Sequence, residues 1–95
     1  MSAFTEVPGK HVADITVYAL SYCPYCKATK EFLKEHDVEY KYVDVDTAPP
    51  QEAEQLMSQV QEYNPDETFP TIVVDGGKEV IVGFNEPAIE KVIAA

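Results

Sequence analysis

The first third of the chain pairs a short hydrophobic run with a longer segment of helical spacing. Residues 15–20 are rich in β-branched and aromatic side chains, which favour a buried strand. Residues 23–36 then repeat small, apolar or aromatic side chains at intervals of three and four, which places them on one helix face. These residues are Cys26, Thr29, Phe32, Leu33 and His36. The pattern predicts a strand followed directly by a helix that ends at Asp37.

The middle of the chain repeats this order. Residues 39–45 alternate between polar and hydrophobic side chains, as a strand does. Pro49-Pro50 is a favoured opening for a helix, and Thr47 is a candidate cap for it. Asn64-Pro65 closes the predicted helix. Its apolar face is formed by Ala53, Leu56, Met57 and Val60.

The last part of the chain predicts a hairpin and a third helix. Residues 71–74 and 79–82 are predicted strands, joined by the tight turn Asp75-Gly76-Gly77-Lys78. Asn85 is a candidate cap for the final helix. The residues of this helix that are expected to face the core are Ala88, Ile89, Val92 and Ile93.

The predicted order of elements is therefore β-α-β-α-β-β-α. A strand–helix–strand crossover joins parallel strands, whereas a hairpin joins antiparallel strands. This order predicts an α/β fold over residues 14–95, with a four-stranded mixed sheet and helices on both faces. Residues 1–13, a polar segment with Pro8-Gly9, are predicted to be a flexible lead-in.

The charge of the chain narrows the classes of partner. The 95 residues include 17 Asp and Glu but only seven cations, all lysine, for a net charge of −10. Phosphate recognition and anionic membranes both call for clustered Lys or Arg, so neither nucleic acid nor a membrane is an expected partner. No apolar run approaches the roughly 18 residues of a spanning helix, and residues 1–14 lack a signal-peptide pattern. A cytoplasmic monomer is expected.

Two cysteines, Cys23 and Cys26, lie where the first strand gives way to the first helix. In a reducing compartment a close cysteine pair is more often catalytic or metal-binding than structural. Residues three apart share one helix face, with Cα atoms roughly 5–6 Å apart, a separation that a disulfide tolerates. The helix N-terminus favours a thiolate at Cys23. Cys23 is therefore the predicted nucleophile and Cys26 the predicted resolving thiol.

The surroundings of the pair support a redox interpretation. Pro24 falls in the first helical turn, where its missing N–H costs nothing. Lys27 is close enough in sequence to add positive electrostatic potential at the cysteines. The alternative is that Lys27 is a solvated surface residue with no such role. A structural zinc site is the main alternative, but it needs four ligands, and His11 and His36 do not supply a second ligand pair. No metal is expected.

Three short motifs, taken together, resemble a known family. Cys23-Pro24-Tyr25-Cys26, Thr68-Phe69-Pro70 and Gly83-Phe84 have the order and spacing found in glutaredoxins, within the thioredoxin-like superfold. The resemblance covers about residues 14–95, and its first motif is similar to the dithiol form of the family. It implies an oxidoreductase with a redox-active disulfide that serves electron transport and cell redox homeostasis. The implied substrates are disulfide-containing proteins or mixed disulfides with glutathione, and no cofactor is held permanently.

The resemblance also implies a substrate groove beside the cysteines. Pro70 matches the family's cis-proline, and Phe69 would offer its backbone to a peptide or to glutathione. The turn that starts at Gly83 matches the amides that receive the γ-glutamyl carboxylate of glutathione. The alternatives are a core position for Phe69 and a plain helix cap at Asn85. The predicted substrate- and glutathione-binding residues are Tyr25, Thr68, Phe69, Pro70, Gly83, Phe84 and Asn85.

Two positions depart from the glutaredoxin pattern. Members that use glutathione usually carry one cation three residues before the first cysteine and another just before the Thr-x-Pro element, where this chain has Leu20 and Glu67. Losing one charge-assisted hydrogen bond costs roughly 1.5–3 kcal/mol. Poor use of glutathione is therefore expected.

The reductant and the partner remain open at this point. Glutathione, another small thiol or a thioredoxin-reductase-like flavoprotein would restore the dithiol. The first alternative is a protein that donates electrons to one dedicated reductase. A thioredoxin-reductase-like enzyme would then re-reduce this donor without glutathione. An alternative from another class is a carrier of an iron–sulfur cluster, against which Pro24 in the motif counts.

Overall fold

Residues 3–94 are described by the computed structural model and form five strands, three α-helices and two short 3₁₀-helices. The predicted positions of the three helices and of four strands are confirmed to within a residue or two. In chain order the elements are β1 (Thr5–Val7), β2 (Ile15–Ala19), α1 (Pro24–Glu35), β3 (Tyr40–Asp44), η1 (Val45–Thr47), α2 (Pro50–Tyr63), β4 (Thr71–Val74), η2 (Asp75–Gly77), β5 (Glu79–Val82) and α3 (Glu86–Ala94).

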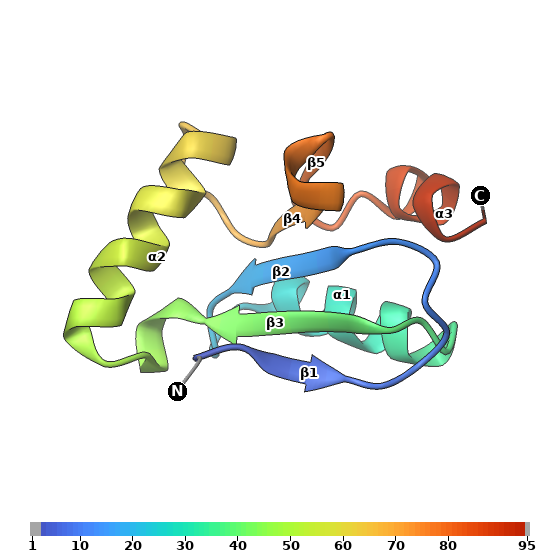
Figure 1. Cartoon of the computed structure of the whole chain (residues 1–95), viewed down its shortest axis with the longest axis horizontal. Coiled ribbons are helices and arrows are strands. Elements are labelled where there is room, and N and C mark those ends of the chain that lie inside the picture. The colour runs from blue at the N-terminus through green and yellow to red at the C-terminus, as the bar shows by residue number, and fades with distance from the viewer. Residues whose placement is uncertain (1–2, 95) are drawn as a thin grey trace.

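The strands form one mixed sheet in the order β1-β3-β2-β4-β5 (Figure 1). β2 and β3 are parallel, as the crossover through α1 requires, and the other neighbours are antiparallel. The predicted thioredoxin-like α/β fold is therefore confirmed. The prediction of four strands is wrong, because β1 adds a fifth at the edge of the sheet.

β1 lies within residues 1–13, which the sequence predicts to be a lead-in outside the sheet. Residues 5–7 pair antiparallel with residues 40–42. Just beyond this strand, a Cβ on Gly9 would lie only 2.7 Å from the backbone nitrogen of Glu39, so a glycine is needed for this close approach. Three mostly exposed residues carry too little alternation to predict a strand, and pairing with a distant partner decides their conformation.

Alternating side chains of the central strands build two hydrophobic cores, one on each face of the sheet. One core packs β2 and β4 against α1 and α3, and it includes Ile15, Val17, Ala19, Cys26, Leu33, Ile72, Val74 and Ile89. The other packs them against α2, and it includes Tyr18, Val43, Leu56, Val60 and Val73. In Figure 1, α1 lies behind β2 and β3. The prediction of helices on both faces is confirmed.

The helix ends follow the sequence with one exception. Asp37, in the left-handed conformation with φ 55°, lies just past the end of α1. The predicted cap at Asn85 is confirmed, since its side-chain oxygen accepts the N–H of Ala88 at 3.4 Å. The predicted cap at Thr47 is wrong, because its hydroxyl donates to the Asp44 carbonyl and the cap position belongs to Pro49. Within residues 3–94, no helix has both the length and the apolar character needed to cross a membrane.

Candidate active site

The two cysteines lie at the junction between β2 and α1. Cys23 is the N-cap residue of α1, with φ −90° and ψ 117°, and Pro24 is the first helical residue. The Sγ atom of Cys23 accepts a hydrogen bond from the backbone N–H of Cys26 at 3.3 Å. The first N–H groups of a helix have no partner within it and carry the positive end of its dipole. The sulfur of Cys23 therefore occupies the position in the helix that best accommodates a negative charge.

The two thiols differ sharply in exposure. Cys23 is half-buried, whereas Cys26 is 0% exposed, and both are free thiols. Burial raises the pKa of the Cys26 thiol to about 12, and its hydrogen bond with Cys23 acts in the same direction. At neutral pH the buried sulfur is therefore protonated and out of reach of solvent. A reagent from solution meets Cys23 first.

The segment before β4 faces the cysteines with its backbone. The peptide bond between Phe69 and Pro70 is cis, as the resemblance implies. The Cys23 thiol donates a hydrogen bond to the Phe69 carbonyl, with 3.9 Å between sulfur and oxygen. Phe69 itself is half-buried and packs against both cores. Phe69 therefore packs against the cores while its carbonyl faces the sulfur, and binding of a substrate to its backbone stays a prediction.

Asn64 holds this segment in place, a role that the sequence does not predict. Its side chain is 3% exposed, and its amide nitrogen lies 3.1 Å from the Thr68 carbonyl, 3.0 Å from the Thr68 hydroxyl and 3.1 Å from the Thr71 hydroxyl. The Thr71 hydroxyl donates in turn to the Thr68 carbonyl at 2.7 Å. Asn64-Pro65 in the sequence indicates only a helix end, because nothing local reveals what a buried amide will bind.

The turn between β5 and α3 also lies against the cis-proline. Gly83 has φ 79°, and its N–H donates to the Pro70 carbonyl at 2.8 Å. The N–H of Asn85 donates to the Gly83 carbonyl at 3.0 Å. The turn that the resemblance assigns to glutathione is thus adjacent to the cysteine site. Two of its amides are engaged inside the protein.

The carboxylate of Asp46 holds the loop that leads from β2 to Cys23 through two hydrogen bonds. The backbone N–H of Ser21 donates to Asp46 at 2.8 Å, and the Ser21 hydroxyl donates to the other oxygen of the same carboxylate. These bonds, the hydroxyl first and the N–H second, lower the pKa of Asp46 below its ordinary value. The two residues are 25 positions apart, so the sequence alone does not pair them.

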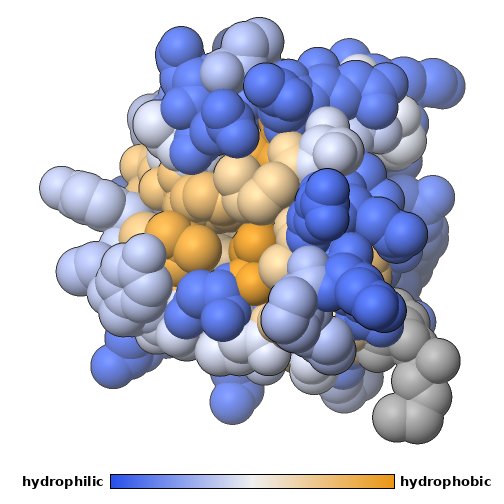
Figure 2. Space-filling model, turned by 90° about the vertical axis from the view of Figure 1, so that its left-hand side faces the viewer, coloured by the Kyte–Doolittle hydropathy of each residue, from blue (hydrophilic) through white to orange (hydrophobic). Residues whose placement is uncertain are grey.

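The side of the molecule at the carboxyl ends of β2 and β3 carries an apolar patch. These strands point to the left in Figure 1, and Figure 2 shows a hydrophobic patch within a hydrophilic surround on that side. Leu20 is a half-buried hydrophobic residue in this region. Tyr22 and Tyr25 are 75% and 66% exposed, and exposed tyrosines are common at protein interfaces. Glu67 and Lys27 are exposed.

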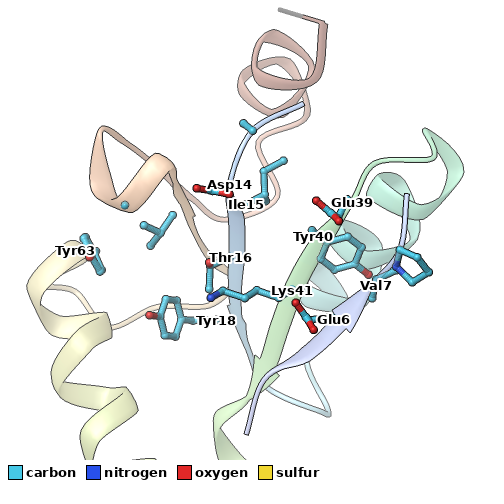
Figure 3. A pocket seen from close by; sticks show the side chains of 14 residues that line it. Glu6, Val7, Asp14, Ile15, Thr16, Tyr18, Glu39, Tyr40, Lys41 and Tyr63 are labelled. Carbon is cyan, nitrogen blue, oxygen red and sulfur yellow. The ribbon is translucent and has the colours of Figure 1, made fainter. Parts of the chain in front are cut away.

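A separate groove lies on the sheet face, away from the cysteines. It encloses about 690 Å³ and is lined by residues of β1, β2 and β3, with Tyr63 from α2. In Figure 3, Lys41, Thr16 and Tyr18 extend into this groove. Neither cysteine lines it, so it is not the redox site. Residues 3–94 also contain no group of three or more His, Cys, Asp or Glu side chains arranged to hold a metal ion.

The sequence and the fold are similar to those of proteins named as glutaredoxins or as glutaredoxin-like. The glutaredoxin family model matches residues 15–79. An uncharacterized glutaredoxin-like 8.6 kDa protein in the rubredoxin operon of Clostridium pasteurianum is 35% identical over 79 residues, 83% of this chain and 96% of that protein. The glutaredoxin of Methanosarcina mazei Go1 superposes with a TM-score of 0.88 at 32% identity, covering 99% of this chain and 90% of that one. Methanosarcina acetivorans methanoredoxin superposes with a TM-score of 0.86 at 34% identity, covering 92% and 90%.

Proposed function

The chain belongs to the glutaredoxin family, and from that premise we propose that it reduces disulfides by using Cys23 and Cys26 in turn. The observation that carries the proposal is the difference between the two thiols. Cys23 is half-buried at the start of α1, and Cys26 is wholly buried one turn inside the helix. An accessible attacking thiol beside a protected resolving thiol is what a dithiol mechanism requires.

The reaction takes two exchanges. The Cys23 thiolate attacks one sulfur of a substrate disulfide, and the other sulfur leaves as a thiol. The mixed disulfide on Cys23 is then attacked by Cys26, which releases the second substrate thiol and leaves Cys23 and Cys26 joined. The Phe69 carbonyl and the exposed rings of Tyr22 and Tyr25 are placed to contact a bound peptide.

The proposal is tested by following the protein's own oxidation. The reduced protein is expected to convert about one equivalent of a peptide disulfide to dithiol and to lose two hydrogens itself, since the exchange is stoichiometric. Intact-mass spectrometry and peptide mapping would place the new disulfide between Cys23 and Cys26. Recovery of the dithiol form after prolonged exposure to excess disulfide would refute the proposal.

We also propose that glutathione is a poor reductant for this site. Leu20 and Glu67 stand where glutaredoxins that use glutathione usually carry cations, and this chain has no positive charge at these two positions. A flavoprotein dithiol reductase or another small thiol would then restore the dithiol. The disulfide-containing partner proteins would be reduced in the same way with either source of electrons.

Glu67→Lys is expected to raise the glutathione-dependent rate by about tenfold, the lower end of what one charge-assisted hydrogen bond provides. Glu67 is exposed, so the change does not disturb the core. The measurement is NADPH consumption in the presence of glutathione and glutathione reductase. Glu90→Lys in α3, also exposed, makes the same change in net charge and is the control. An equal gain in both variants would indicate a general charge effect, and brisk turnover of the unmodified protein would contradict the prediction.

A further inference from the structure

An ion pair is enclosed between α1 and the sheet, on the side of the molecule that holds Cys26. The ammonium nitrogen of Lys30 lies 2.8 Å from a carboxylate oxygen of Asp44, and the two side chains are only 22% and 20% exposed. The same nitrogen lies 4.2 Å from the centre of the Tyr42 ring. Withdrawing two charges from water is unfavourable, and their mutual attraction often does no more than offset that cost. A contribution to the stability of the fold is therefore a weak explanation for the presence of this ion pair.

The ion pair of Lys30 and Asp44 lies about one helical turn from the buried thiol of Cys26. Cys26 and Lys30 are four residues apart in α1, a spacing that brings their Cβ atoms to about 5–6 Å on one helix face. Asp44 is the last residue of β3 and is paired in register with Ala19, the last residue of β2. The cation is therefore fixed by the sheet at the end where the chain passes into the cysteine loop.

The resolving step needs a positive charge in this place. Cys26 is 0% exposed, and burial is the main reason that its pKa rises to about 12. Two contacts lower this pKa, first a hydrogen bond with the backbone of Leu20 and then the charge of Lys30, whereas the neighbouring Cys23 raises it. Lys30 is the cation whose charge acts on this buried thiol, so it is the side chain suited to stabilise the negative charge that develops on Cys26 during its attack.

We propose that Lys30, held by Asp44, is a positioning residue for the resolving step and stabilises the charge that develops on the Cys26 sulfur. This inference rests on the proposed dithiol function. In the step, the bond between the substrate sulfur and Cys23 breaks as the bond between Cys26 and Cys23 forms. The proton of Cys26 ends on the departing thiol, and no outside oxidant takes part. Asp44 fixes the ammonium group in place, and Lys30 supplies the charge.

A reaction with an aromatic disulfide separates the two steps. Reduced protein mixed with one equivalent of 5,5′-dithiobis(2-nitrobenzoic acid) is expected to release a first coloured thiolate as Cys23 attacks and a second as Cys26 resolves. Lys30→Gln is expected to leave the first phase unchanged and to slow the second by about tenfold, the equivalent of one pKa unit of lost charge stabilisation. Lys30→Arg keeps the charge and is expected to restore the second phase to within about twofold on the same scale.

Two further variants make the outcome decisive. Lys34→Gln removes an exposed lysine one turn further along α1 and is expected to change neither phase. Lys30→Met combined with Asp44→Leu removes both charges together, which proteins often tolerate without loss of stability, and it is expected to slow only the second phase. An unchanged second phase in Lys30→Gln and in the double variant, or equal slowing of both phases, would overturn the inference. Absence of a second phase in the unmodified protein would instead refute the proposed function.

Discussion

Replacement of Cys23 by serine is expected to abolish disulfide reduction, whereas replacement of Cys26 by serine is expected to stop the reaction at a mixed disulfide. A serine hydroxyl at position 23 is not ionised at neutral pH and cannot form the first sulfur–sulfur bond. With Cys23 intact and Cys26 absent, the first exchange proceeds, but no internal thiol completes the second. The difference follows from the positions of the two residues, one capping α1 and the other buried inside it.

Mass spectrometry distinguishes the two variants directly. After incubation with a peptide disulfide, Cys26→Ser is expected to carry one covalently bound peptide on Cys23, and Cys23→Ser is expected to carry none. The chain contains only these two cysteines, so no other thiol can produce the adduct. Cys26 in the Cys23→Ser variant is shielded by the fold and stays protonated, because burial raises its pKa to about 12. Equal adduct formation or equal residual turnover in both variants would contradict the assigned roles.

The main features of this site could be predicted because they are local. Cys23-Pro24-Tyr25-Cys26 lies between a β-branched run and a segment of helical spacing, and those two patterns place the pair at a strand-to-helix junction. The hairpin of β4 and β5 and the cap at Asn85 follow from signals only a few residues long. Local signals of this kind depend on backbone preferences that tertiary contacts here reinforce.

The supporting contacts could not be predicted because they join distant parts of the chain. Ser21 and Asp46 are 25 residues apart, and Lys30 and Asp44 are 14 apart. Nothing in the residue types shows which lysine meets which of the 17 acidic side chains. The fifth strand has the same origin, since residues 5–7 become a strand only by pairing with β3. Long-range pairing thus explains both the missed strand and the missed residues around the cysteines.

Those contacts also change the interpretation of the site. The motif alone describes two thiols at a helix start. The structure adds a carboxylate that ties the preceding loop through Ser21, a buried amide at Asn64 that shapes the segment before the cis-proline, and a cation beneath Cys26. The geometry around the dithiol therefore depends on Asp46 in η1 and Asn64 at the end of α2, as well as on α1 itself, which carries Lys30.

Leu33→Ala is expected to lower the free energy of unfolding by about 2–5 kcal/mol, the usual cost of removing a buried leucine side chain. Leu33 is 1% exposed and packs with Val17 and Ile72 in the core that holds α1 against the sheet. A small domain is typically stable by only about 5–15 kcal/mol, so this single change removes a large share of the total. Urea unfolding of the reduced protein, followed by circular dichroism, measures it.

The matched control is Val82→Ala, which truncates an aliphatic side chain that is 47% exposed on β5. Surface changes of this kind usually stay within about 0.5 kcal/mol. The slope of the unfolding free energy against urea concentration is expected to be the same in both variants, because the surface exposed on unfolding is nearly unchanged. A loss below about 1 kcal/mol for Leu33→Ala, well under the usual range for such a site, would mean that α1 is not seated on the sheet as described. The position of Cys23 would then need another explanation, since the packing of α1 is what holds its N-cap residue beside the Phe69 carbonyl.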